Sequence, residues 1–515
     1  MKKWIIGSVL LVLLVIGGVI VMSFQAYMKD QLEMQYDKEV ISEFKRPISF
    51  DIYDLNAFDQ YDFIHERVYE KSIEEIQKKL LNGEFSTVEL CKYYLKRIEK
   101  YQSFNAVNQI NPNVLDQAAQ VDQKIANGNT GALFGVVVLI KDNIASVDMN
   151  TSAGAYPLKD LTTKRNATVT QALIDQDAII LGKANLSEWS NFMSSPSSNG
   201  FSVLGGQTKH AYGKFDVGGS SSGSSVAAAL SLSTVTIGTE TAGSLIYPAG
   251  QNSVVALKPT MGLLSRDLIV PIAEAQDSAG VIARSVSDLE KVFHHILLED
   301  ANDPASLIVN DYNKTVNLDQ NALNGKTLGL YNTGSEEVTQ IVKEFEAAGA
   351  KVIEIELDPS AYEVDMMSVL NHGIVHDVDV FLANDAVKSH FKSMKEILAF
   401  YEENQDKAPY GYALLEGGFA FEGDVDLIIE NNLKLTRGAL DKTLENVDAI
   451  ISISNELSGV YAPAGYPAIT VPSGYKESGE PFGVTLVGGY LEDQMLIEIA
   501  YAYEVNTKHR KNPTE

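Results

Sequence analysis

The chain of 515 residues has very little cysteine and is short of positive charge. Its one cysteine, Cys91, excludes a disulfide framework, which needs cysteines in pairs. Lysine and arginine number 41 against 68 aspartates and glutamates, which gives a formal net charge of −27 at pH 7. Because nucleic-acid binding depends on Lys and Arg contacts to phosphate, this acidity argues against a nucleic-acid partner. The hydrophobic fraction of 45% is high enough to form a large core and excludes global disorder.

Long uncharged hydrophobic runs are absent except at the N-terminus. The segment Trp4–Phe24 (WIIGSVLLVLLVIGGVIVMSF) follows Lys2 and Lys3 and contains no charged residue. As a helix of about 21 residues it would measure about 31 Å, which is the thickness of a bilayer core. We therefore expect residues 1–28 to form a retained single-pass membrane anchor. A cleaved signal peptide is the alternative, and it fits less well because the run is long and lacks an A-x-A-like end.

The charges beside this run predict its orientation. The two N-terminal lysines place the N-terminus in the cytoplasm by the positive-inside bias, so the rest of the chain would lie outside the cell membrane. If the segment is a signal peptide, the protein would be secreted after cleavage. Residues 29–71 are polar and dotted with aromatic side chains, which is typical of a spacer. Residues 72–515 contain no repeat and no evident linker, and we expect them to form one large domain.

Strand patterns alternate with helical patterns through most of that domain. Continuous apolar runs of strand length and composition are typical of strands buried on both faces, and they occur at residues 135–141, 177–185, 233–241 and 253–259. Helical patterns lie between them, and residues 325–357 have the pattern of one βαβ unit. Residues 360–440 are mainly helical in pattern and contain no motif. This alternation predicts an α/β fold with a largely parallel sheet.

The most unusual segment of the chain is the glycine- and serine-rich stretch Val217–Ser225 (VGGSSSGSS). It has neither the Walker pattern nor G-x-G-x-x-G, so a phosphate cradle is not indicated. Gly219–Gly223 matches the G-x-S-x-G nucleophile elbow of α/β-hydrolases, with Ser221 at its centre. The residues before it do not have the pattern of a buried strand, which the elbow requires. Ser221 and Ser222 are therefore expected to cap the following helix or to support the loop.

Three motifs in order resemble the amidase signature family: IKDN at 140–143, GGSSSGS at 218–224 and GTETAGS at 238–244. Further text adds to the resemblance at residues 182–189, 251–266, 276–289 and 464–475. The resemblance covers about residues 72–510. It implies the fold of that family, a large mixed, mostly parallel twisted sheet covered by helices on both faces. It also implies an amidase that hydrolyses a small-molecule or peptide amide and needs no metal or cofactor.

The resemblance also implies a role for individual residues. Ser244 matches the nucleophile, Ser220 the bridging serine after a cis peptide bond, and Lys141 the catalytic lysine. An ammonium cannot accept a proton, so this lysine must be neutral, and burial would lower its pKa. The remaining implied residues are the oxyanion-hole N–H groups of Thr241, Ala242, Gly243 and Ser244, and the supporting residues Gly219, Thr239 and Asp142.

Some features depart from the family pattern or suggest other chemistry. The family text is more often T-D-T where this chain has Glu240, and Tyr247 stands where members acting on small acidic amides carry an arginine. His372 and His376 would share one face of a helix but lack a third metal ligand, so we expect ordinary helix residues or pocket lining there. The alternatives to an amidase are an α/β-hydrolase-like esterase and a catalytically silent surface binding protein. A transamidase subunit is disfavoured, because a tRNA partner does not suit an acidic domain outside the cell.

Overall fold

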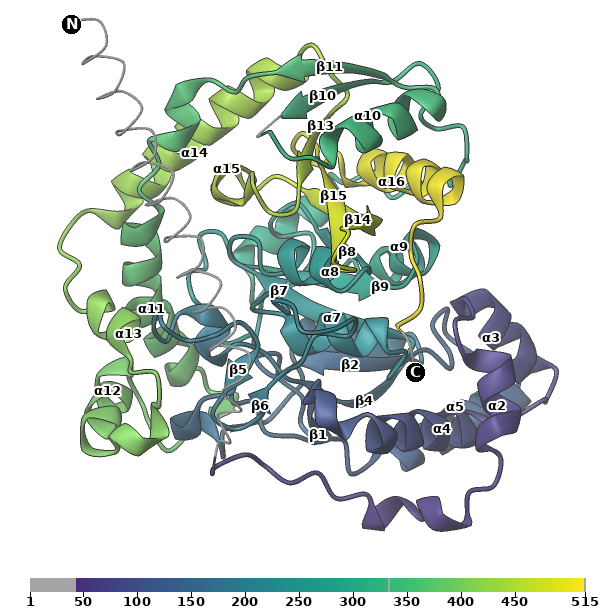
Figure 1. Cartoon of the computed structure of the whole chain (residues 1–515). Coiled ribbons are helices and arrows are strands. Elements are labelled where there is room, and N and C mark those ends of the chain that lie inside the picture. The colour runs from purple at the N-terminus through teal and green to yellow at the C-terminus, as the bar shows by residue number, and fades with distance from the viewer. Residues whose placement is uncertain (1–42, 332–333, 514–515) are drawn as a thin grey trace, which may run out of the picture. The chain divides into compact units, whose positions relative to one another are not determined.

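The computed structural model describes residues 43–331 and 334–513, and these are built around one large sheet (Figure 1). In spatial order its eleven strands are β1 (Val107–Ile110), β4 (Ile179–Ala184), β2 (Val137–Lys141), β7 (Val235–Glu240), β9 (Ser278–Ala283), β8 (Val255–Lys258), β14 (Ala468–Tyr475), β15 (Pro481–Val487), β13 (Ala449–Ile453), β10 (Thr327–Tyr331) and β11 (Lys351–Ile355). Two small ribbons pair β3 (Thr162–Thr163) with β12 (Val387–Lys388), and β5 (Phe201–Ser202) with β6 (Gly206–Gln207). Each of the buried strands expected from the sequence is present.

Parallel pairing is confined to two blocks of the large sheet. One block contains β4, β2 and β7, and the other contains β13, β10 and β11. The pairs between the blocks are antiparallel, as is the pair of β1 with β4. The sheet is therefore mixed, as expected, but the expectation of a mostly parallel sheet is wrong for its middle.

One tight connection and the direction of β9 account for three of the five antiparallel pairs between the blocks. A tight turn at residues 476–480 joins β14 to β15, and strands joined so closely must run antiparallel. In addition, β9 lies between β7 and β8 and is antiparallel to both. The hydrophobic pattern does not identify β9 as a strand, because its text, SAGVIA, lacks the long aliphatic run of its neighbours.

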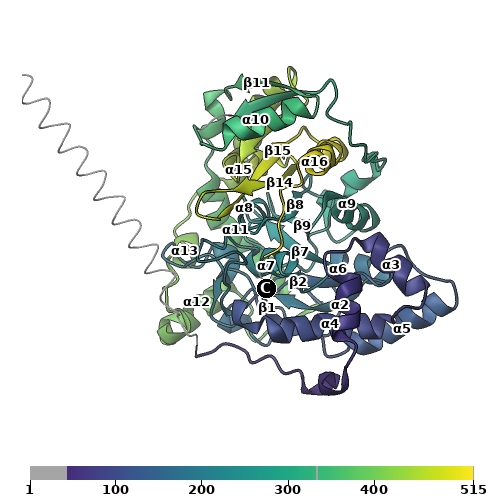
Figure 2. The ribbon, with the colours of Figure 1, turned by 45° about the vertical axis from the view of Figure 1, so that its right-hand side comes forward.

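Helices cover the sheet on both faces, as expected (Figures 1 and 2). Their bounds are α2 (Tyr61–Val68), α3 (Ile73–Leu81), α4 (Thr87–Lys100), α5 (Val114–Ala126), α6 (Thr168–Asp175), α7 (Ser222–Ala229), α8 (Ile246–Gln251), α9 (Val286–His295), α10 (Val338–Ala347), α11 (Met366–Ala383), α12 (Met394–Glu403), α13 (Ala413–Gly418), α14 (Val425–Leu444), α15 (Ser458–Ala464) and α16 (Asp493–Thr507). The region 360–440 is mainly helical, as its pattern predicts, and forms α11 to α14.

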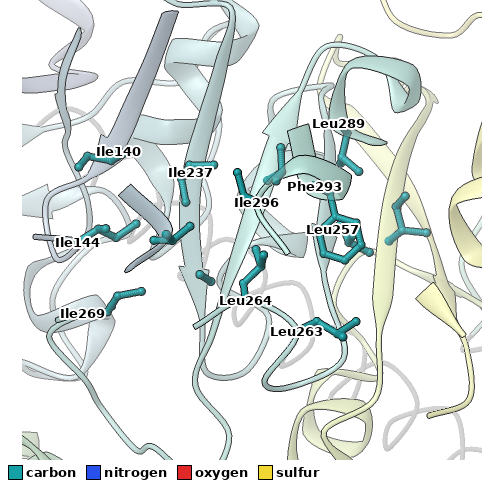
Figure 3. Packing of buried hydrophobic residues seen from close by; sticks show 14 of the residues in the cluster. Ile140, Ile144, Ile237, Leu257, Leu263, Leu264, Ile269, Leu289, Phe293 and Ile296 are labelled. Atoms are coloured by element: carbon teal, nitrogen blue, oxygen red, sulfur yellow. The ribbon is translucent and has the colours of Figure 1, made fainter. Parts of the chain in front are cut away.

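Strand β2 shows how the sheet is buried on both faces. Its alternate residues Val138 and Ile140 belong to one hydrophobic cluster, whereas Val137 and Leu139 belong to a second cluster that includes residues of α4 and α7. Figure 3 shows part of the first cluster, with Ile140 of β2 beside Ile237 of the neighbouring strand β7. A strand with apolar neighbours on both sides needs a continuous apolar sequence, which is the pattern that its residues have.

The residues before α3 pack against the second cluster. Short 3-10 helices at Asp51–Tyr53 and Leu55–Ala57 lead to α2, and Tyr53 donates a hydrogen bond to the carbonyl of Asn111 at 3.1 Å. The described part of the predicted spacer is thus packed against the domain. Cys91 is fully buried in the same cluster, and burial raises the pKa of its thiol. Its role is packing, as expected.

Within residues 43–331 and 334–513, no helix combines the length and the apolar character needed to cross a membrane. The predicted membrane helix, residues 4–24, lies outside the described residues, as does the rest of the segment 1–28.

Candidate active site

The three predicted motifs meet at one edge of the sheet. Lys141 is the last residue of β2, and Glu240 is the last residue of the adjacent strand β7. Because the two strands are parallel, their carboxyl ends lie at the same edge, which is where α/β sheets usually place their sites. The loop Gly218–Ser221 reaches this edge immediately before α7. Lys141 and Ser220 are therefore in contact although they are 79 residues apart in the chain.

The amino group of Lys141 lies among hydroxyl groups. Its Nζ is 2.8 Å from Ser220 Oγ, 2.8 Å from Thr239 Oγ1 and 3.1 Å from Ser221 Oγ. A fourth contact, at 3.3 Å, joins it to the carbonyl oxygen of Thr239. The side chain is completely buried. None of these four partners is a carboxylate that would hold the positive charge of the lysine.

This environment changes the acid–base behaviour of Lys141. Burial lowers its pKa from 10.5 to about 7, because removal from water disfavours the ammonium form. The negative charges of Asp277 and Glu240 act in the opposite direction and raise the pKa, but burial dominates. A large fraction of Lys141 is therefore neutral at neutral pH, in agreement with the sequence-based expectation.

Ser220 is fixed by its backbone on both sides. The peptide bond Gly219–Ser220 is cis, as the family resemblance implies, and the Ser220 carbonyl accepts a hydrogen bond from the N–H of Ser187 at 3.1 Å. A Cβ at Gly219 would lie 2.6 Å from both Asn199 Oδ1 and Ser187 Oγ, so any side chain there would displace these polar groups. The loop therefore holds the Ser220 hydroxyl toward Lys141.

Ser244 lies in the turn between β7 and α8. It is 8% exposed, whereas Lys141 and Ser220 are fully buried, so Ser244 is the one of the three that solvent or substrate reaches. Its carbonyl accepts the N–H of Ser221 at 3.2 Å, which joins the turn to the Ser220 loop. Gly243 has a φ of +83°, and a Cβ there would lie 2.7 Å from Asn455 Nδ2, so the turn requires glycine at this position.

Asp142 and Asn143 hold the loop that follows β2. The carboxylate of Asp142 accepts hydrogen bonds from Asn108 Nδ2 and Gln109 Nε2, both at 3.1 Å, and from the hydroxyl of Ser152. The side chain of Asn143 donates to Thr239 Oγ1 at 3.0 Å. Thr239 Oγ1 is thus contacted by both Asn143 and Lys141, which places it inside the polar network around the lysine.

A second carboxylate supports the turn that contains Ser244. Asp277 accepts a hydrogen bond from the hydroxyl of Thr241 and from the N–H groups of Ile272 and Ala273, at 2.8 and 3.1 Å. Burial raises its pKa to about 6. These groups border a cavity of about 20 Å³, which is room for about one water molecule. Its lining residues include Asn143, Thr239, Thr241, Ile272 and Asp277.

Ser221 has the position expected of it but makes different contacts. It stands at the N-cap position of α7, but its side chain makes no capping bond. Instead its hydroxyl contacts Lys141 Nζ and donates to the Thr239 carbonyl at 2.8 Å. Ser222 supports the loop by donating to the Gly218 carbonyl at 2.5 Å. Ser221 is fully buried and no strand immediately precedes its loop, so the geometry does not fit a nucleophile elbow.

His372 and His376 lie on α11 with their rings stacked, 4.9 Å apart between centroids. His376 bonds to the carboxylate of Asp377 at 2.9 Å, and Asp377 accepts the N–H of Glu274 at 2.8 Å. In residues 43–331 and 334–513, no group of three His, Cys, Asp or Glu side chains is placed to hold a metal ion. Through Asp377, His376 lies at the contact between α11 and the loop beside the cavity, whereas the His372 ring packs edge-on against Phe421.

Comparison with known proteins defines the class of this chain. The family model described as Amidase matches residues 89–456. A probable amidase of Arabidopsis thaliana is 34% identical over 470 residues, covering 87% of this chain and 92% of the relative. The chain therefore belongs to the amidase signature family.

Two solved structures are similar to it. An amidase family protein from Bacillus anthracis has a TM-score of 0.85 and 32% identity, covering 95% of this chain and 98% of its own. The native peptide amidase from Stenotrophomonas maltophilia has a TM-score of 0.81 and 33% identity, with 87% and 99% covered. The family and these neighbours establish an amide-hydrolysing enzyme as the class.

Proposed function

We propose that the protein hydrolyses carboxamides through a relay of Lys141, Ser220 and Ser244. The observation that supports it most is the fully buried amino group of Lys141, 2.8 Å from Ser220 Oγ and with a pKa near 7. A serine hydroxyl is a weak nucleophile and needs an adjacent base. A neutral amine in this position can accept the proton of Ser220, and Ser220 can accept the proton of Ser244.

The reaction would then take place in two stages. Ser244 Oγ attacks the amide carbonyl carbon while its proton passes through Ser220 to Lys141, forming a tetrahedral intermediate. The C–N bond breaks as the same relay returns the proton to the leaving nitrogen, so ammonia or an amine departs and an acyl-enzyme remains. Water then attacks the acyl carbon in the same way, which releases the carboxylic acid and restores Ser244.

The turn Thr241–Ser244 would stabilise the negative charge of the intermediate. In this proposal the N–H groups of Thr241, Ala242, Gly243 and Ser244 form the oxyanion hole. Losing one such donor typically costs about 2.7–4 kcal/mol of barrier. Gly219, Thr239 and Asp142 would support the relay by holding the loops and the amino group of Lys141.

The substrate would be a neutral small-molecule or peptide amide. Tyr247 stands where family members that act on small acidic amides carry an arginine. Its hydroxyl donates a hydrogen bond to the carboxylate of Asp216 at 2.9 Å. A carboxylate on the substrate would be repelled by the negative charge of Asp216 at this position. The similarity to a peptide amidase supports peptide amides within this class. A silent binding protein fits less well, because the Lys–Ser–Ser set is intact.

A panel of amides tests this proposal. The full-length protein in detergent would be incubated with primary amides, anilides and peptide amides, and ammonia or amine release would be measured. We expect turnover of neutral amides and little turnover of amides that carry a carboxylate nearby. Turnover of the corresponding esters without turnover of any amide would favour the esterase alternative. No turnover and no labelling by a fluorophosphonate would favour the binding-protein alternative.

We also propose that residues 4–24 are a retained membrane anchor, with the enzyme domain outside the cytoplasm. The uncharged length of this segment and the lysines before it support the proposal. We expect mass spectrometry of the membrane-extracted protein to recover residues 1–28 intact. Recovery in the medium of a protein that begins near residue 27 would instead establish a cleaved signal.

A further inference from the structure

A glutamate at the end of β7 spans the turn that contains Ser244. Glu240 is 1% exposed, and its Oε2 accepts hydrogen bonds from the N–H of Leu245 at 2.7 Å and of Ile246 at 3.1 Å. These N–H groups stand at the start of α8, where a helix leaves its donors without internal partners. The side chain therefore closes residues 241–244 into a ring that is held at both ends.

The other oxygen of Glu240 is held by a distant part of the chain. Tyr461 in α15 is fully buried and donates its hydroxyl to Glu240 Oε1 at 2.8 Å. Tyr461 and Ile246 belong to one hydrophobic cluster, so the tyrosine is itself held by packing. Three donors thus face the two oxygens of one carboxylate, a group that accepts hydrogen bonds without donating any when it is ionised.

We propose that Glu240 is a positioning residue that holds the turn Thr241–Ser244 in the conformation needed for reaction. This inference rests on the proposed function, because it concerns the same site. Glu240 touches no substrate and acts through the turn. Donors that are already in place stabilise a transition state without reorganising, and a misplacement of about 1 Å can cost about 10²-fold in rate.

Two substitutions separate the hydrogen bonds of Glu240 from its charge. Glu240→Met has a similar length but leaves the N–H groups of Leu245 and Ile246 without an acceptor. Glu240→Gln keeps one oxygen for them, and Tyr461 can accept from the new amide. We expect kcat to fall about 10²-fold in Glu240→Met with KM within about threefold, and to recover to within about tenfold of wild type in Glu240→Gln.

The pH profile supplies a second measurement. Glu240 and Asp277 are the two carboxylates whose charges raise the pKa of Lys141. Both substitutions remove the charge of Glu240, so the inflection of kcat/KM is expected to move to lower pH in both. The fall in plateau kcat is expected only in Glu240→Met. The pH profile therefore reports the charge of Glu240, and the plateau kcat reports its effect on the position of the turn Thr241–Ser244.

Active-site titration with a fluorophosphonate distinguishes positioning from folding. A residue that only supports the fold would reduce the number of titratable sites and leave kcat per site unchanged. If Glu240→Met does not fold, Tyr461→Phe replaces it, with an expected fall of a few fold in kcat per site. Tyr503→Phe is its matched control, since Tyr503 is also fully buried and donates to a glutamate, Glu344, at 2.6 Å.

The outcomes separate this inference from the proposed function. If the wild-type protein releases no ammonia or amine from any amide, the proposed function fails. If the wild type is active but Glu240→Met keeps its kcat per titrated site, the positioning role is overturned and the proposed function stands. Equal kcat per site in Tyr461→Phe and Tyr503→Phe would also overturn the positioning role.

Discussion

Replacing Ser244 with alanine is expected to lower amide turnover by about 10⁶-fold, the size of effect seen when an enzyme loses its nucleophile. The substitution removes the oxygen that would form the bond to the acyl group, while the backbone N–H groups of the turn remain. Substrate binding should therefore change little. Ammonia release at saturating substrate measures kcat. Covalent labelling by a fluorophosphonate should also be lost in the Ser244→Ala variant.

Ser233→Ala is the matched control for this experiment. Ser233 is a fully buried serine that lies just before β7, at the opposite end of that strand, and donates to the Val235 carbonyl at 2.9 Å. Its loss should leave turnover and labelling unchanged. Wild-type turnover in Ser244→Ala, or label on Ser221, would show that the nucleophile has been assigned to the wrong serine.

The second large effect concerns Lys141 and pH. With a pKa of about 7, roughly half of Lys141 is neutral at pH 7, whereas a lysine of ordinary pKa would be neutral in about one molecule in 3000. Because the neutral form is the base, kcat/KM should rise about tenfold per pH unit below the inflection and level off above it. Lys141→Met should abolish this inflection and lower kcat by about 10²- to 10⁴-fold.

Lys183→Met is the control for that profile. Lys183 is a fully buried lysine on the neighbouring strand β4, and burial lowers its pKa to about 8, but its amino group contacts Ile144 O and Thr151 Oγ1 and not the serines. The inflection should survive in this variant. Asp277 also titrates near the site, with a pKa near 6, so an inflection near pH 6 that disappears in Asp277→Asn would refute the assignment to Lys141.

The sequence predicts those parts of the site that depend on short motifs and on local hydrophobic patterns. Lys141, Ser220 and Thr239 come together because β2 and β7 are apolar strands whose carboxyl ends share one edge of the sheet. The buried lysine and the buried Cys91 also agree with expectation, as does the cis bond before Ser220, which the family resemblance implies. Each follows from a motif or from a run of apolar residues.

The parts that sequence reasoning missed depend on distant contacts. The quoted motifs contain Asn143 and Asp277, but nothing in their text shows that one contacts Thr239 and the other Thr241. Ser187 lies in the quoted segment 182–189, but nothing in that segment shows that its N–H binds the Ser220 carbonyl. Strand β9 was missed because small residues serve as well as large ones between two packed neighbours. These positions are chosen by tertiary packing, which a single sequence does not reveal.

The hydrogen bond between Tyr461 and Glu240 has a consequence for the order in which the enzyme matures. It joins residues 221 positions apart, and β8 similarly pairs with β14, far along the chain. During synthesis the lysine, both serines and the turn emerge long before Tyr461 does. Contacts between such distant residues form late, because the intervening chain must first be ordered. A nascent chain that ends before α15 therefore contains every proposed catalytic residue but lacks the contact that holds the turn, and hydrolysis would begin only once the C-terminal strands have joined the sheet.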